Sequence, residues 1–143
     1  MKKLLPLLVL ASAVSCAPLP TQTVAPTRVT TTVGYVTGTI PAGADNPVLA
    51  AVVSTAPTAP TTSGRQPWRA EEIERNQVVL RSNATSQNTS TFGSFIQTLP
   101  QEMTWGVISS GNTTTVTATY SSAYAATAQY IFDQLDKRFR RVR

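Results

Sequence analysis

Five basic side chains crowd the last seven residues of this chain and form its densest group of charge. They are Lys137, Arg138, Arg140, Arg141 and Arg143. Cations near the C-terminal end of a helix interact favourably with its dipole, so a preceding helix would explain part of this cluster. The same density of charge predicts contact with an anionic surface, such as lipid phosphates, an acidic envelope polymer or an acidic partner protein.

Other reactive side chains are scarce. The chain has no histidine, the commonest general base and metal ligand, and its single cysteine excludes a zinc site built on cysteine and histidine. The six carboxylates between residues 71 and 136 are expected on solvated helix faces or in ion pairs, whereas a glycosidase needs two across a cleft. We therefore predict no catalytic residue, no metal site and no cofactor, and we do not expect an enzyme.

The cysteine, Cys16, follows a segment that is typical of export. Two lysines precede an apolar run of 11 residues from Leu4 to Val14, and small residues lie just before the cysteine. This order of charged, apolar and small residues predicts a secretory signal peptide over residues 1–15. With a cysteine directly after the cleavage site, residues 1–16 resemble the lipobox signal of bacterial lipoproteins. The resemblance implies cleavage before Cys16 and lipidation of its thiol.

Membrane attachment would then depend on Cys16, because 11 apolar residues are too few for a span, which needs roughly 20. Two or three acyl chains hold a protein stably, since each buried methylene contributes about 0.8 kcal/mol. Ala13 stands where the lipobox family usually has leucine, and residues 13–15 also fit an ordinary signal peptidase. Ala17, rather than aspartate, follows the cysteine and favours the outer membrane if the source is Gram-negative.

Residues 16–66 have the composition of a linker that follows the lipid anchor. Residues 17–64 contain twelve threonines and seven prolines, but only Arg28 and Asp45 are ionisable. This predicts a disordered, low-complexity stalk. Apolar patches within residues 29–40 and 48–53 leave short strands open as an alternative. Removal of residues 1–15 leaves 128 residues and lowers the net charge from +5 to +3, because two lysines are lost.

Residues 67–143 carry the periodic patterns of a folded domain. We predict a short helix over residues 68–76, a strand over 77–81 and a loop over 82–89. A second helix is expected over residues 89–99, ending at Pro100. Its apolar side chains fall on one helical face; they are Phe92, Phe95, Ile96 and Leu99.

The strongest pattern is a hairpin over residues 103–120, in which apolar and polar residues alternate on both sides of the turn at 109–112. A long helix is expected from Ser122 to the C-terminus. Its apolar stripe consists of Tyr124, Ala128, Ile131 and Leu135, widened by Phe132 and Phe139. Its i,i+4 ion pairs would be Asp133 with Lys137 and Asp136 with Arg140. The predicted fold class is α+β, a small two-layer domain with a roughly three-stranded antiparallel sheet and two or three helices.

These patterns predict a lipid-anchored protein of the cell membrane or envelope that acts as a tether, scaffold or docking module through residues 67–143. Its expected partners are the membrane, through the N-terminal lipid, and an envelope protein or anionic envelope polymer. Nucleic acid is not an expected partner because the chain is exported. One alternative is an envelope lipoprotein, encoded by a phage or mobile element, that blocks entry into the cell or disrupts the envelope. A second alternative is a soluble secreted binding protein.

Overall fold

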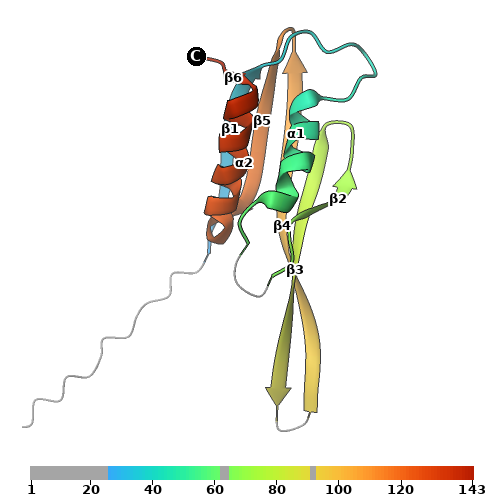
Figure 1. The fold of residues 1–143 in the computed structure, drawn as a ribbon, viewed down its shortest axis with the longest axis vertical. Coiled ribbons are helices and arrows are strands. Elements are labelled where there is room, and N and C mark those ends of the chain that lie inside the picture. Colours follow the sequence, from blue (N-terminus) through green and yellow to red (C-terminus); the bar gives the residue numbers. More distant parts are fainter. Residues whose placement is uncertain (1–25, 62–64, 91–92) are drawn as a thin grey trace, which may run out of the picture.

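The computed structural model describes residues 26–61, 65–90 and 93–143. Its centre is a six-stranded antiparallel sheet in the order β2-β3-β4-β5-β1-β6, with two α-helices on one face (Figure 1). The strands are β1 (Arg28–Val36), β2 (Arg69–Ile73), β3 (Gln77–Ser90), β4 (Gly93–Ser110), β5 (Thr113–Ser121) and β6 (Arg140–Arg141). The helices are α1 (Pro47–Thr55) and α2 (Ala125–Arg138), with short 3-10 turns η1 (Ala56–Thr58) and η2 (Ser122–Tyr124).

The predictions of a disordered stalk and of a three-stranded sheet are wrong. β1 pairs along its whole length with β5, from Arg28 opposite Ser121 to Val36 opposite Thr113. α1 packs its buried Val48 and Val52 into the core. The threonines that gave this stretch its low-complexity character are β-branched and suit a strand, so composition concealed the period-2 pattern. Of the predicted stalk, residues 16–25 and 62–64 lie outside the described part of the chain.

Asn46 fixes the start of α1 and its position over the sheet. Its side-chain oxygen accepts hydrogen bonds from the main-chain N–H groups of Val48 (2.9 Å) and Leu49 (3.3 Å), and Pro47 occupies the first turn. The amide nitrogen of the same side chain donates to Ser109 Oγ in β4 at 2.8 Å. One buried residue therefore caps the helix and ties it to a central strand.

Two predicted helices are strands. Residues 68–76 contain β2 and residues 89–99 belong largely to the β3–β4 hairpin, which also takes in the predicted loop over 82–89. The hairpin register runs without a shift from Gln77 opposite Gly106 to Ser90 opposite Gly93. At residues 93–99, pairing with a partner strand overrides the helical spacing of the apolar residues, because short apolar runs fit either period. Phe92 lies outside the described residues.

The far part of the β3–β4 hairpin projects beyond the sheet (Figure 1). β2 pairs only as far as Arg81 in β3, and β5 reaches only Thr104 in β4. The main-chain bond from Val107 N–H to the Asn76 carbonyl (2.8 Å) implies that odd-numbered β4 residues bond to β3. The ring nitrogen of Pro100 therefore faces the side that β5 does not reach, and no ladder bond is lost there.

Three predictions are confirmed. The strand over 77–81 begins β3. The hairpin over 103–120 is the β4–β5 pair, closed by a two-residue loop in which Gly111 has a φ of +59°, a conformation that favours glycine. The expected long helix is α2, although it ends at Arg138 and not at the C-terminus, and most of its predicted stripe is buried: Ala128, Ile131, Phe132 and Leu135.

The core lies between the helices and the face of the sheet that they cover. Trp105 of β4 packs against Phe132 of α2 with ring centroids 4.9 Å apart, and the rings of Trp68 and Tyr124 form a T-shaped pair with centroids 5.5 Å apart. Both tryptophans are almost fully buried. No described element covers the opposite face of the sheet, where Ile108 keeps 74% of its surface exposed. The two α-helices therefore cover only one face of the sheet.

Candidate functional site

The basic cluster lies where α2 gives way to β6. Phe139 ends the helix with an extended backbone (φ −129°, ψ 141°), while its N–H still donates to the Leu135 carbonyl at 2.8 Å. Its ring packs beside Tyr35 of β1, with centroids 6.2 Å apart. The chain then pairs antiparallel with the end of β1, and Val142 N–H donates to the Gly34 carbonyl at 2.9 Å. Arg140 and Arg141 therefore lie in a strand and not in the predicted helix.

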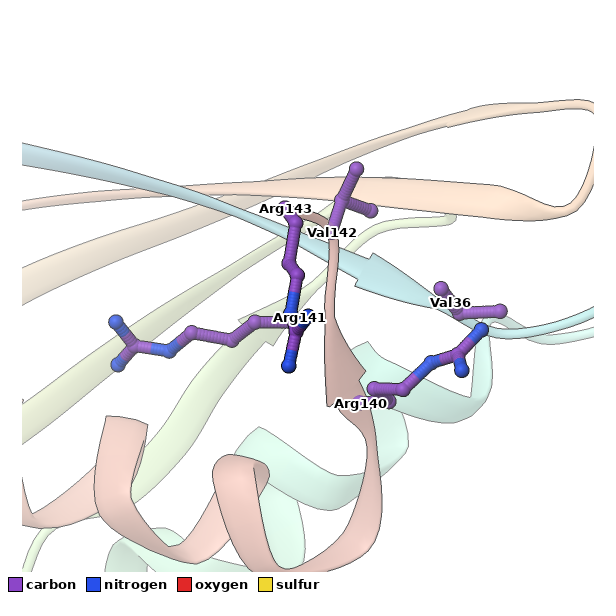
Figure 2. Close-up of a pocket in the computed structure, with 5 residues that line it drawn as sticks. All are labelled: Val36, Arg140, Arg141, Val142 and Arg143. Atoms are coloured by element: carbon purple, nitrogen blue, oxygen red, sulfur yellow. The ribbon is translucent and has the colours of Figure 1, made fainter.

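Because the helix ends before Arg140, Asp136 forms its ion pair with a different arginine from the predicted one. Prediction paired this carboxylate with Arg140, but Arg141 forms the ion pair, with Nε to Oδ1 at 2.7 Å and Nη2 to Oδ2 at 2.8 Å. Successive residues of a strand point to opposite faces. Arg141 lies opposite the buried Tyr35 on the helix side, whereas Arg140 lies opposite Val36 on the other side (Figure 2).

Tyr35, Asp136 and Arg141 form a connected polar cluster at the margin of the core. The Tyr35 hydroxyl donates to Asp136 Oδ1 at 3.0 Å. The hydrogen bond from Arg141, assisted by the one from Tyr35, holds the pKa of Asp136 below its usual range. Burial, and then the neighbouring Asp136 carboxylate, raise the pKa of Tyr35 well above its usual value. The charge of Arg141 is therefore balanced within the fold.

The other four cations of the cluster have no carboxylate partner among the described residues. One of them, Arg138, donates a hydrogen bond to Ser54 Oγ of α1 at 3.2 Å. Lys137, Arg140 and Arg143 are exposed, and within the described residues none of them forms an ion pair or a side-chain hydrogen bond. Arg140 and Arg143 help to line a shallow pocket of about 460 Å³ with Val36, Arg141 and Val142 (Figure 2). The cluster can thus bind an external anion without breaking an internal contact.

This basic surface lies at one end of the sheet, and the chain enters the fold at the other. β6 pairs with Tyr35 and Val36, the last residues of β1, whereas Arg28 begins β1. Nine residues of strand separate the two ends by roughly 26 Å. Figure 1 shows β6 and the C-terminus at one end of the molecule and the start of β1 and the projecting hairpin toward the other.

Three of the carboxylates gather around one arginine on the open face of the sheet. Arg81 of β3 gathers Glu71 (2.9 Å), Glu72 (3.3 Å) and Glu102 (3.0 Å) on the open face of the sheet. The hydrogen bond with Glu71, followed by that with Glu102, raises the pKa of Arg81. Across the residues that the structure describes, no three acidic or cysteine side chains lie close enough to hold a metal ion. These carboxylates instead form an exposed ion cluster.

A second concave surface lies between α1 and β2. Its volume is about 310 Å³, and its apolar part includes Leu49, Val53 and Ile73, the last 63% exposed. Asp45, Glu74 and Arg75 stand around it. Their mixed charges do not select a ligand of one sign, whereas the charged residues that line the C-terminal pocket are all arginines. The C-terminal surface is therefore the better candidate for a functional site.

Comparisons with known proteins do not indicate a function for this chain. No protein-family model, no curated protein and no solved structure matches the chain. No helix in the described ranges is long and apolar enough to cross a membrane. Cys16, the predicted lipidation residue, lies outside these ranges.

The cations of this site are evident in the sequence, whereas the residues that organise them are not. The sequence predicts Tyr35 in a linker and Asp136 paired with Arg140, but Tyr35 lies in β1 and Asp136 pairs with Arg141. The alternation of Val33, Tyr35 and threonines was the available signal for a strand, but nothing local in the sequence indicated that β1 and β6 would be neighbours. That contact joins residues more than 100 positions apart.

Proposed function

We propose that this protein is a lipid-anchored docking module of the cell envelope, which uses its C-terminal basic surface to hold an anionic partner. Lys137, Arg140 and Arg143 form this surface, and Arg138 adjoins it. The lipid attachment rests on the signal-like segment and Cys16. The observation that carries the docking role is a group of exposed cations at the end of the sheet away from the start of β1, which form no ion pair with any residue that the structure describes.

The placement of the surface favours a partner other than the lipid that would hold the anchor. Pro26 lies ten residues after Cys16, a stretch that can span at most about 35 Å. The basic surface lies a further β1 length from that attachment point. When the start of β1 faces the membrane, these cations lie on the side of the domain away from it, where they would meet an acidic protein or an anionic envelope polymer.

The anchor is tested by Cys16→Ser. We expect the wild-type protein to fractionate with membranes and to remain there after a high-salt wash, because acyl chains resist salt. The serine variant should be released into the soluble fraction. A variant that stays with membranes after the wash would contradict lipid anchoring through Cys16.

The basic surface is tested by Arg140→Gln with Arg143→Gln. We expect binding to immobilised poly-glutamate to weaken by about tenfold, and wild-type binding to fall as salt is added, because exposed charges are screened. The melting temperature should change little, since exposed cations contribute only about 0.3–1 kcal/mol each. The control is Arg69→Gln with Arg75→Gln, which removes the same charge at the opposite edge of the sheet.

The control should bind as the wild type does. Equal losses in both double variants would mean that net charge alone governs binding, and the proposed site would be wrong. Binding of phosphatidylglycerol vesicles in preference to poly-glutamate would replace the acidic partner with a lipid surface.

A further inference from the structure

The two edges of the sheet are protected to different degrees. At one edge, β2 carries charged residues and a bulge between Ala70 and Glu72, both of which discourage the addition of another strand. At the other edge, β6 covers only Tyr35 and Val36 of β1, and the bond from Val142 to Gly34 is the last main-chain contact along that side. No strand in the described part of the chain lies beside residues 28–33.

The hydrogen-bond pattern shows which main-chain groups this leaves open. Thr37 N–H donates to Asn112 and Ser122 N–H donates to Thr27, so odd-numbered residues of β1 direct their main-chain groups toward β5. Even-numbered residues face the other way, as the bond to the Gly34 carbonyl confirms. The N–H and C=O groups of Arg28, Thr30 and Thr32 therefore point to the uncovered edge. This row of donors and acceptors is a template for an extended segment.

From these features we propose that the open edge of β1 binds an extended acidic segment of the partner as an added strand, antiparallel to β1 and in line with β6. This inference rests on the proposed docking function and names the mode of binding. Val29 and Val33 pack only partly into the core, so alternate apolar residues of the incoming segment would complete their burial. Residues 29–33 carry no charge that would repel a strand.

The charges at the two ends of the open edge of β1 favour an acidic segment as the added strand. Arg28 stands at one end of the open stretch and Arg143 follows Val142 at the other, and both are exposed. Glu102 lines the same shallow pocket as Arg28, but it is bound to Arg81 at 3.0 Å. An antiparallel second copy would bring the Arg28 of one chain toward the basic end of the other, which like charges oppose. A segment with carboxylates at both ends meets opposite charge at each.

The test uses the full mature chain and a short synthetic peptide with Asp at both ends and alternating Val and Thr between them. We expect binding to protect the amides of Arg28, Thr30 and Thr32 from hydrogen exchange, measured by NMR, and to leave the amides of their odd-numbered neighbours unchanged. The same peptide N-methylated on alternate amides keeps its charge but loses main-chain donors, and it should bind about tenfold more weakly.

Variants separate the main chain from the side chains. Thr30→Pro removes one outward N–H and leaves the β5 ladder intact, so it should also weaken peptide binding by about tenfold. Thr30→Val with Thr32→Val keeps the main chain and should bind as the wild type does. Circular dichroism checks that each variant is folded, and the N-methylated peptide tests the same point on the unmodified protein.

The outcomes distinguish this inference from the function on which it rests. If the N-methylated peptide binds equally well while Arg140→Gln with Arg143→Gln still weakens poly-glutamate binding, the added strand is wrong and the docking surface stands. If neither change has an effect, both fail. A concentration-dependent dimer with the same three amides protected in the absence of peptide would make a second copy the occupant and overturn the acidic segment.

Discussion

The two faces of the sheet carry different side chains although both are built from the same strands. β5 shows this most clearly. Its residues on the helix side are all buried: Thr114, Val116, Ala118 and Tyr120. Its residues on the open side are exposed or half-exposed threonines: Thr113, Thr115, Thr117 and Thr119. Alternation along one strand thus supplies a core to one face and hydroxyl groups to the other.

This difference implies that stability and binding are assigned to separate parts of the molecule. Threonines on the open face satisfy one another across strands, as between Thr30 and Thr119 (3.4 Å) and between Thr32 and Thr117 (3.3 Å). Such exposed pairs add little to the free energy of folding, but their β-branched side chains favour extended backbone. The open face and the β1 edge can therefore change without loss of the core.

The largest effect should come from a core residue compared with an open-face residue of the same strand. Trp105→Ala should lower the free energy of unfolding by about 3–5 kcal/mol, because it leaves a cavity against Phe132. Ile108→Ala removes a side chain that is 74% exposed and should change stability by less than about 0.5 kcal/mol. Urea unfolding followed by circular dichroism measures both. Similar costs at the two positions would refute the division between the faces.

A smaller effect is expected for two threonines of β5 that differ only in the face they occupy. The Thr114 hydroxyl contacts Thr37 Oγ1 (3.0 Å), Ser109 Oγ (3.1 Å) and Asn46 Nδ2 (3.4 Å). Thr114→Val keeps the shape but leaves these buried groups short of a partner, so it should cost about 1–3 kcal/mol. Thr117→Val on the open face is the matched control.

Thr117→Val should change the free energy of unfolding by less than about 0.5 kcal/mol in the same urea titration. If Thr114→Val were equally harmless, the buried hydroxyl cluster that holds the start of α1 against β4 would have no role in stability.

The smallest effect concerns the two ion clusters. Asp136→Asn breaks the pair with Arg141 at the margin of the core and should cost about 1 kcal/mol, whereas Glu102→Gln on the open face should cost less than about 0.5 kcal/mol. Because the folded pKa of Asp136 is lowered, its contribution is present above the unfolded pKa of about 3.9 and is lost as the pH falls through the lower folded pKa.

Melting temperatures between pH 7 and pH 2 test this. The difference between wild type and Asp136→Asn should shrink below about pH 4. A constant difference across that range would mean that the ionised carboxylate is not what Arg141 stabilises. Tyr35 gives the opposite sign, because its raised pKa means that its contribution is present below about pH 10 and lost as the pH rises further.

The sequence predicted the secondary structure correctly where the spacing of apolar residues matches the side chains that are buried. Met103 and Trp105 alternate with polar residues before a turn, and Ile131 and Leu135 recur at helical spacing, so β4, β5 and α2 were predicted. It failed for residues 68–76 and 89–99, where short segments fit a helix or a strand and the partner strand decided. For β1, the threonine-rich composition favours disorder, and the alternative of a short strand within residues 29–40 is the one that the structure confirms.

The candidate site shows the same limit. The amino-acid sequence by itself determined which residues are cationic, that a helix precedes them, and that Cys16 ends a signal-like segment. Only the tertiary structure decided that Asp136 balances Arg141 and that, among the described residues, Arg140 and Arg143 have no ionic partner and no strand covers the edge of β1 at residues 28–33. The reason is that strand pairing joins distant residues: β6 lies beside β1 through long-range hydrogen bonds that no local pattern encodes.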